Sequence, residues 1–135
     1  MIKTRIGKQD EKKLPVLIHE LDRLVSEVVR RSNSDASGNC TCISCSAKGH
    51  WSDFDCAHFI DRGNMNTRFN LINLAPACRY CNRHDEDFHK EAWAKKLGPE
   101  IVATLEREGK SLRKLFRFEL EQGIELMNRK LLELK

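Results

Sequence analysis

The 135-residue sequence lacks any long hydrophobic run. No apolar stretch approaches the roughly 20 residues that a membrane-spanning helix needs, which excludes an integral membrane protein of the helical type. The charged start, Met1–Arg5, is not followed by an apolar segment, so we expect no secretory signal and a cytoplasmic location. In that reducing compartment, six cysteines are expected to be free thiols or metal ligands instead of disulfides.

A strong excess of one charge is also missing. The 24 basic and 20 acidic residues leave a net charge of +4, which favours nucleic acid only weakly and is no polybasic signature. The sequence contains no internal repeat and no low-complexity tract. A chain of this length forms one domain, or a small core with helical extensions. Composition therefore leaves the function open.

What is present divides into three parts within a single compact domain. Residues 1–39 form a basic N-terminal arm and a helix, residues 40–97 hold all the cysteines, and residues 98–135 have a helical pattern. Apolar spacing and turn residues predict the individual elements. These are helices over 14–32, from 78 to 97, over 101–109 and from Ser111 to 134, and an irregular hairpin of strands 54–60 and 69–74. Gly123 costs the last helix about 1 kcal/mol of propensity.

Two Cys-x-x-Cys pairs are the clearest chemical signal. Cys42 and Cys45 form one pair and Cys78 and Cys81 the other, with 32 residues between them. Zinc prefers four such ligands in a tetrahedron, so the pattern predicts a structural zinc that joins two distant segments. Cys40 lies two residues before the first pair and is an alternative to Cys42. Cys56 fits a small buried side chain better than a ligand.

The loop that the zinc would close contains Ala57-His58, then Asn73 fifteen residues later and Asn82 nine residues after that. In this arrangement the chain resembles the HNH endonucleases. More narrowly, Cys-Ile-Ser-Cys, Ala-His-Phe, Arg-Phe-Asn-x-x-Asn and Cys-x-x-Cys-Asn resemble the NinG family of lambdoid phages, also called Rap. The resemblance implies an α+β fold in which a zinc-stapled treble-clef or ββα-metal module is flanked by N- and C-terminal helices.

The same resemblance implies a function. It is that of a metal-dependent, structure-specific DNA endonuclease that cuts branched recombination intermediates, such as Holliday junctions and D-loops, in the host cytoplasm. His58 would be the general base that activates water, a task that suits an imidazole at neutral pH. Asn73 would bond the backbone around the hairpin and orient His58. Asn82 would supply an amide oxygen to a catalytic Mg²⁺ or Mn²⁺.

One position departs from the HNH pattern. Many HNH nucleases carry an acidic residue or a histidine directly before the catalytic histidine as a metal ligand, and Ala57 stands there in this chain. Asp55, on the same face of an alternating strand, and Glu86, one helical turn after Asn82, are the candidates to complete the site. Asp85 is a weaker candidate.

DNA would be held mainly through its phosphates, which lysine and arginine contact without reading sequence. The candidates near the site are Arg62, Arg68, Arg79 and Arg83, with basic residues of the N-terminal arm as a further possibility. A branched substrate with near-symmetric arms favours a homodimer. Two alternatives stay open. They are a non-catalytic zinc module that binds DNA or a recombination protein, which Ala57 favours, and an HNH nuclease that nicks ordinary duplex DNA.

Overall fold

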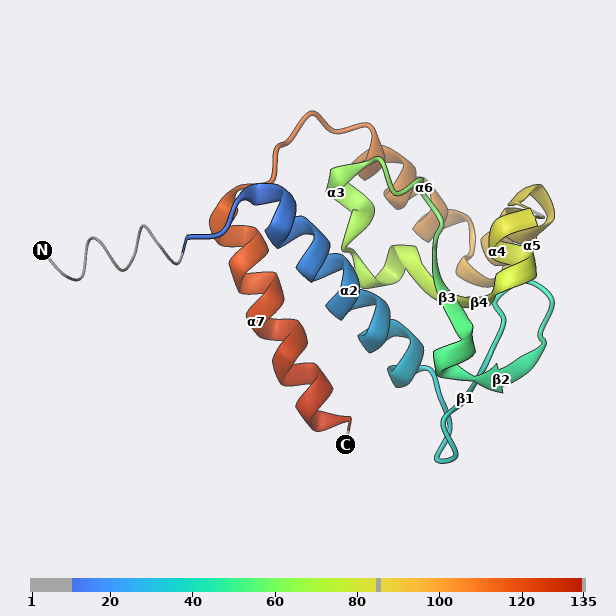
Figure 1. Cartoon of the computed structure of the whole chain (residues 1–135). Helices are drawn as coiled ribbons and strands as arrows, with labels where there is room; N and C mark the ends of the chain where they lie inside the picture. The colour runs from blue at the N-terminus through green and yellow to red at the C-terminus, as the bar shows by residue number, and fades with distance from the viewer. Residues whose placement is uncertain (1–10, 85, 135) are drawn as a thin grey trace, which may run out of the picture.

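The structure is a computed structural model that describes residues 11–84 and 86–134, without the side chains of 86–89. A long helix precedes two antiparallel pairs of strands, and a run of helices follows them (Figure 1), so the protein is α+β, as predicted. The strands are β1 (Asn39–Thr41), β2 (Lys48–His50), β3 (Phe54–His58) and β4 (Leu74–Cys78). The helices are α2 (Leu14–Ser32), α3 (Met65–Arg68), α4 (Arg79–His84), α5 (Glu86–Leu97), α6 (Pro99–Gly109) and α7 (Arg117–Glu133), with 3-10 turns η1 (Trp51–Asp53) and η2 (Leu71–Asn73).

The two flanking helices α2 and α7 pack against each other, side by side in Figure 1. The bounds of α2 match the predicted helix, because its apolar stripe, which includes Leu17, Leu21 and Val28, is buried as the spacing requires. Leu120 and Met127 of α7 complete this apolar cluster. Gly123 does not interrupt α7. A Cβ at this position would lie 3.1 Å from a Leu21 methyl carbon, so the missing side chain lets the helices approach closely.

The β3–β4 hairpin lies between two apolar clusters. Its register pairs Phe54 with Cys78 at one end and His58 with Leu74 at the other. Leu74 joins the cluster of α2 and α7, whereas Ala57 and Phe54 join a second cluster that contains Trp93 of α5 and Leu105 of α6. The hairpin is thus held on both faces, which fixes the positions of the polar side chains at its edges.

The second predicted strand, 69–74, is wrong. Residues 71–73 form the turn η2, and the strand that pairs with β3 is 74–78. The Asn70 side chain accepts a hydrogen bond from the Ile72 N–H and so begins the turn, while the Ile72 side chain is exposed. Pro76 is compatible with β4 because both strands of a two-stranded sheet are edges. The first predicted strand is confirmed over 54–58.

The last helix begins at Arg117 and not at the predicted Ser111. Leu112, the first apolar residue of the predicted helix, is 95% exposed and lies in a segment without helical structure. The Glu119 carboxylate accepts a hydrogen bond from the Phe116 N–H at 3.1 Å, which caps the true start of α7. The predicted break between α5 and α6 is confirmed, with Gly98 at φ 89° and proline in the first turn.

Two further sequence expectations concern the molecule as a whole. Within the described residues, no helix is both long and apolar enough to cross a membrane. The start of the predicted basic arm, with Lys3, Arg5 and Lys8, lies outside the described residues.

Candidate metal centre and basic groove

The four cysteines of the two Cys-x-x-Cys pairs come together in space. Cys42 and Cys45 lie in the turn between β1 and β2, while Cys78 ends β4 and Cys81 lies in α4. Their sulfur atoms all lie within 4.8 Å of one another, and the sulfurs of Cys45 and Cys78 are 3.8 Å apart. A tetrahedral zinc with Zn–S bonds of about 2.3 Å separates its sulfurs by about 3.8 Å. The quartet can therefore hold a zinc ion.

Backbone geometry prepares these sulfurs for a metal. The Ser44 N–H donates to the Cys42 sulfur, and the Cys81 N–H donates to the Cys78 sulfur. Burial raises the pKa of Cys42, but backbone N–H groups outweigh that effect and lower this pKa to about 7. Burial and the neighbouring sulfurs raise the pKa of Cys81 to about 12. A divalent cation among the sulfurs offsets the repulsion that the last thiolate meets.

The other two cysteines lie outside the quartet. Cys40, in β1, is buried, and burial raises the pKa of its thiol. Cys56 packs against the cluster of α2 and α7, and burial raises the pKa of its thiol to about 12. Both therefore behave as small apolar side chains, and Cys42 is the ligand that the geometry favours over Cys40.

A groove of about 730 Å³ is lined by residues of α2, β3 and α4, together with the segment that follows β3. Six arginines and three aspartates are among its lining residues, so the groove is basic. The structure brings together here the predicted His58, Asp55 and Asn82 and all four predicted DNA-binding arginines. The six arginines are Arg23, Arg30, Arg62, Arg68, Arg79 and Arg83.

Asp55 and Asn82 are in direct contact on one side of the groove. The Asn82 amide donates to the Asp55 carboxylate at 3.0 Å, and Arg83 donates to both oxygens of this carboxylate at 2.9 and 3.0 Å. Ala57 is only 1% exposed and pairs with Ala75, so this position of the HNH pattern faces the core. The oxygens of Asp55 and Asn82 are thus the hard donors that β3 and α4 present together.

These donors fit a largely hydrated Mg²⁺ or Mn²⁺, which needs few protein ligands. Metal binding would require Arg83 to release one of the two Asp55 oxygens. Among the described residues, the cysteine quartet is the one group of three or more cysteine, histidine or acidic ligands close enough to share a metal. The side chains of Asp85 and Glu86, the other predicted candidates, lie outside the described residues.

His58 is the last residue of β3, and its half-buried ring lines the groove. Burial lowers the pKa of His58 below its ordinary value of 6.5, and the nearby Asp22 carboxylate opposes this shift without cancelling it. The ring is therefore neutral at pH 7 and has a lone pair for a proton. This is the state that a general base requires.

Asn73 is fully buried, with 0% of its side chain exposed. Its amide oxygen accepts from the Ile60 N–H at 2.7 Å, and its amide nitrogen donates to the carbonyls of Ile60 and Thr67 at 3.2 and 3.1 Å. The side chain therefore holds the backbone two residues after His58 against α3. That this contact supports catalysis stays a prediction.

Sequence reasoning missed Asp22. This α2 residue accepts hydrogen bonds from Arg68 at 3.0 and 2.5 Å and from Arg62 at 2.9 Å. Burial raises the pKa of Asp22, but the two guanidinium groups outweigh burial and lower this pKa below its usual range. Asp22 thus orients two arginines beside His58. The arginines lie 40 and 46 residues further along the chain, so no local pattern marks the contact.

Fold and site together define an α+β protein in which a four-cysteine candidate zinc centre lies next to a basic groove. The family model described as "Bacteriophage Lambda NinG protein" matches residues 2–135. The chain therefore belongs to the NinG family. The searches of curated proteins and of solved structures found no match.

Proposed function

We propose that this NinG-family protein is a metal-dependent, structure-specific DNA endonuclease that cuts branched recombination intermediates such as Holliday junctions and D-loops. The observation that carries the proposal is the groove, which gathers His58, Asp55 and Asn82 among six arginines. A neutral histidine, hard oxygen donors and guanidinium groups are the parts that phosphodiester hydrolysis needs. The family resemblance, carried by the same residues, supports the HNH type.

In the proposed reaction, His58 takes a proton from water as the water oxygen forms a bond to phosphorus. The bond from phosphorus to the 3′ oxygen breaks, and this oxygen leaves with a proton from solvent. Mg²⁺ or Mn²⁺ held by Asp55 and Asn82 would supply positive charge for the phosphate and the leaving oxygen. Asn73 restrains the segment that follows His58 through its three backbone hydrogen bonds.

The arginines give the groove affinity for the DNA backbone without base recognition, as a protein that recognises DNA structure requires. Arg62 and Arg68 are held on the His58 side by Asp22, and Arg83 lies on the Asp55 side. Two cuts in a near-symmetric junction are most simply made by two copies of the chain, so we propose a homodimer. Light scattering of the purified protein, free and junction-bound, tests this arrangement.

Cleavage of a synthetic four-way junction in Mg²⁺ or Mn²⁺ tests the proposal, with linear duplex of the same sequence beside it. We expect wild type to cut the junction and His58→Ala to bind it without cutting. Equal cutting of junction and linear duplex would instead make the protein an HNH nuclease that nicks ordinary duplex DNA.

A second candidate is a non-catalytic zinc module that binds DNA or a recombination protein. Two observations favour it. Arg83 occupies both oxygens of Asp55, and Ala57 faces the core where many HNH nucleases have a metal ligand. Tight junction binding by wild type without cleavage in either metal would support this candidate and refute the endonuclease.

A further inference from the structure

The only tyrosine of the chain is exposed on α4, the helix whose Arg79, Asn82 and Arg83 line the groove. Tyr80 lies in α4 and is 66% exposed, although a tyrosine ring gains free energy when it is buried. Its neighbours in this helix all have other contacts. Cys81 belongs to the sulfur quartet, and Asn82 and Arg83 bind Asp55. Tyr80 is therefore a large aromatic surface that the fold leaves available.

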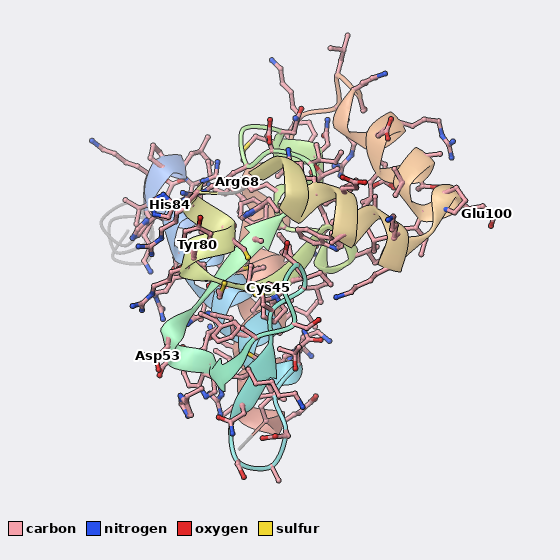
Figure 2. The ribbon with its side chains drawn as sticks, turned by 90° about the vertical axis from the view of Figure 1, so that its right-hand side faces the viewer. Cys45, Asp53, Arg68, Tyr80, His84 and Glu100 are labelled. Carbon is pink, nitrogen blue, oxygen red and sulfur yellow. The ribbon has the colours of Figure 1, made fainter. Side chains whose placement is uncertain are left out.

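A second ring steadies Tyr80. The ring centres of Tyr80 and His84, one helical turn later, are 5.4 Å apart with an angle of 38° between the planes. Figure 2 shows the two side chains next to each other on α4. Tyr80 also lies between Cys78 and Cys81, so a zinc in the quartet fixes the backbone that carries the ring. A surface held in this way loses little conformational entropy when a ligand binds.

The surroundings of Tyr80 are basic. Arg79 directly precedes Tyr80 and Arg83 follows it by three residues; both line the groove, where Arg83 also pairs with Asp55. His84 is exposed beside the ring. Such a charged patch disfavours an apolar protein partner and suits a ligand that combines a flat π surface with negative charge. An unpaired nucleotide has both. Aromatic rings next to basic side chains are the usual platform for single-stranded nucleic acid.

We propose that Tyr80, supported by His84, stacks against an unpaired base of the DNA that enters the groove. The inference rests on the proposed function, because the groove must bind DNA, and it specifies the substrate. The preferred DNA has an unpaired nucleotide directly next to a duplex, as occurs at a branch point or a flap. The arginines hold the duplex phosphates while α4 receives the exposed base.

The test compares the binding of wild type, Tyr80→Phe and Tyr80→Ala to two DNAs in buffer without Mg²⁺ or Mn²⁺, the metals that the proposed cleavage needs. One DNA is a duplex with a short single-stranded flap and 2-aminopurine at its first unpaired position. The other is the same duplex fully paired. Stacking on the ring quenches the fluorescence of 2-aminopurine. Melting curves and zinc content check that the variants remain folded.

We expect Tyr80→Ala to lose the quenching and to bind the flap about 5- to 150-fold more weakly, the range for one lost base–aromatic stack. Tyr80→Phe keeps the ring and should resemble wild type, and all three proteins should bind the paired duplex alike. Unchanged flap affinity and quenching in Tyr80→Ala would overturn the inference.

The outcome is separable from that of the nuclease proposal. Tyr80-dependent quenching by a protein that never cuts DNA in Mg²⁺ would support the stacking site and refute the nuclease. Normal junction cleavage by Tyr80→Ala, with its flap binding unchanged, would do the reverse.

Discussion

Replacing Asn73 by alanine tests the link between the buried amide and the stability of the hairpin. The substitution removes three hydrogen bonds to backbone atoms of Ile60 and Thr67 and leaves those buried groups without these partners. A hydrogen bond contributes about 0.5–1.5 kcal/mol net, and a buried group left unpaired costs about 1–3 kcal/mol. We therefore expect Asn73→Ala to lower the free energy of unfolding by about 2–4 kcal/mol, a large part of the 5–15 kcal/mol typical of a domain.

Asn70 offers a matched control on the same turn. Its side chain caps η2 through the Ile72 N–H and donates to the Glu108 carboxylate at 3.3 Å, both in solvent-exposed positions. Asn70→Ala should therefore cost only about 1 kcal/mol. Guanidinium unfolding of both variants, with zinc present, gives the two values. If Asn73→Ala were no less stable than Asn70→Ala, the buried amide would not be what holds the hairpin.

Three further predictions address the metal centre, the groove and the proposed base. Cys81→Ala should lose its zinc and melt at a lower temperature, while Cys40→Ala should keep a full complement of zinc; metal analysis showing full zinc in Cys81→Ala would refute the quartet. Asp22→Asn should destabilise the protein by about 1–2 kcal/mol at pH 7, because two charged hydrogen-bond donors lose an anionic partner. The pKa of Asp22 is lowered in the folded state, so this stabilisation is present above about pH 3.9, the ordinary value for aspartate, and is lost as the pH falls through the folded pKa. The unfolding free energies of wild type and Asp22→Asn should therefore converge in acid. A constant difference between them would contradict the ion pairing. Because burial lowers the pKa of His58 below 6.5, the rate of junction cleavage should be nearly constant between about pH 7 and 8 and should fall only at lower pH. A cleavage rate that rises tenfold between pH 7 and pH 8 would refute a neutral His58 as the base.

The parts of the fold with a local signal were predictable. The apolar stripe that includes Leu17, Leu21 and Val28 predicted both ends of α2. The prediction is correct because the structure buries each of these residues. The Cys-x-x-Cys spacing likewise predicted the sulfur quartet, because each turn places its two sulfurs without help from the rest of the chain.

The errors come from conformations that apolar spacing does not determine. Ile72 resembles a strand residue but is exposed in a turn, while β4 contains a proline and alanines and is defined by its pairing with β3. Leu112 is apolar and precedes the buried stripe of α7, but it is itself exposed. The pairing of β4 with β3 joins distant segments, which single-sequence patterns do not contain. The starts of η2 and α7 instead have local caps at Asn70 and Glu119, which apolar spacing alone does not reveal.

The candidate site divides in the same way. His58, Asn73 and Asn82 were identified through the resemblance to the HNH endonucleases. In the structure His58 and Asn82 line the groove, and Asn73 is buried. Asp22 had no signal because an aspartate on a helix surface is common, and only the folded chain brings Arg68 to it. The catalytic roles of these residues stay predictions.

The central claim is that His58 activates water for the cleavage of branched DNA. Single-turnover cleavage of a four-way junction in Mg²⁺ by wild type and His58→Ala, at saturating protein and equal zinc content, measures this most directly. We predict that the His58→Ala rate is lower by about 10²- to 10⁴-fold, the usual contribution of a general base, with junction affinity unchanged. A His58→Ala protein that cuts the junction at the wild-type rate would contradict the account.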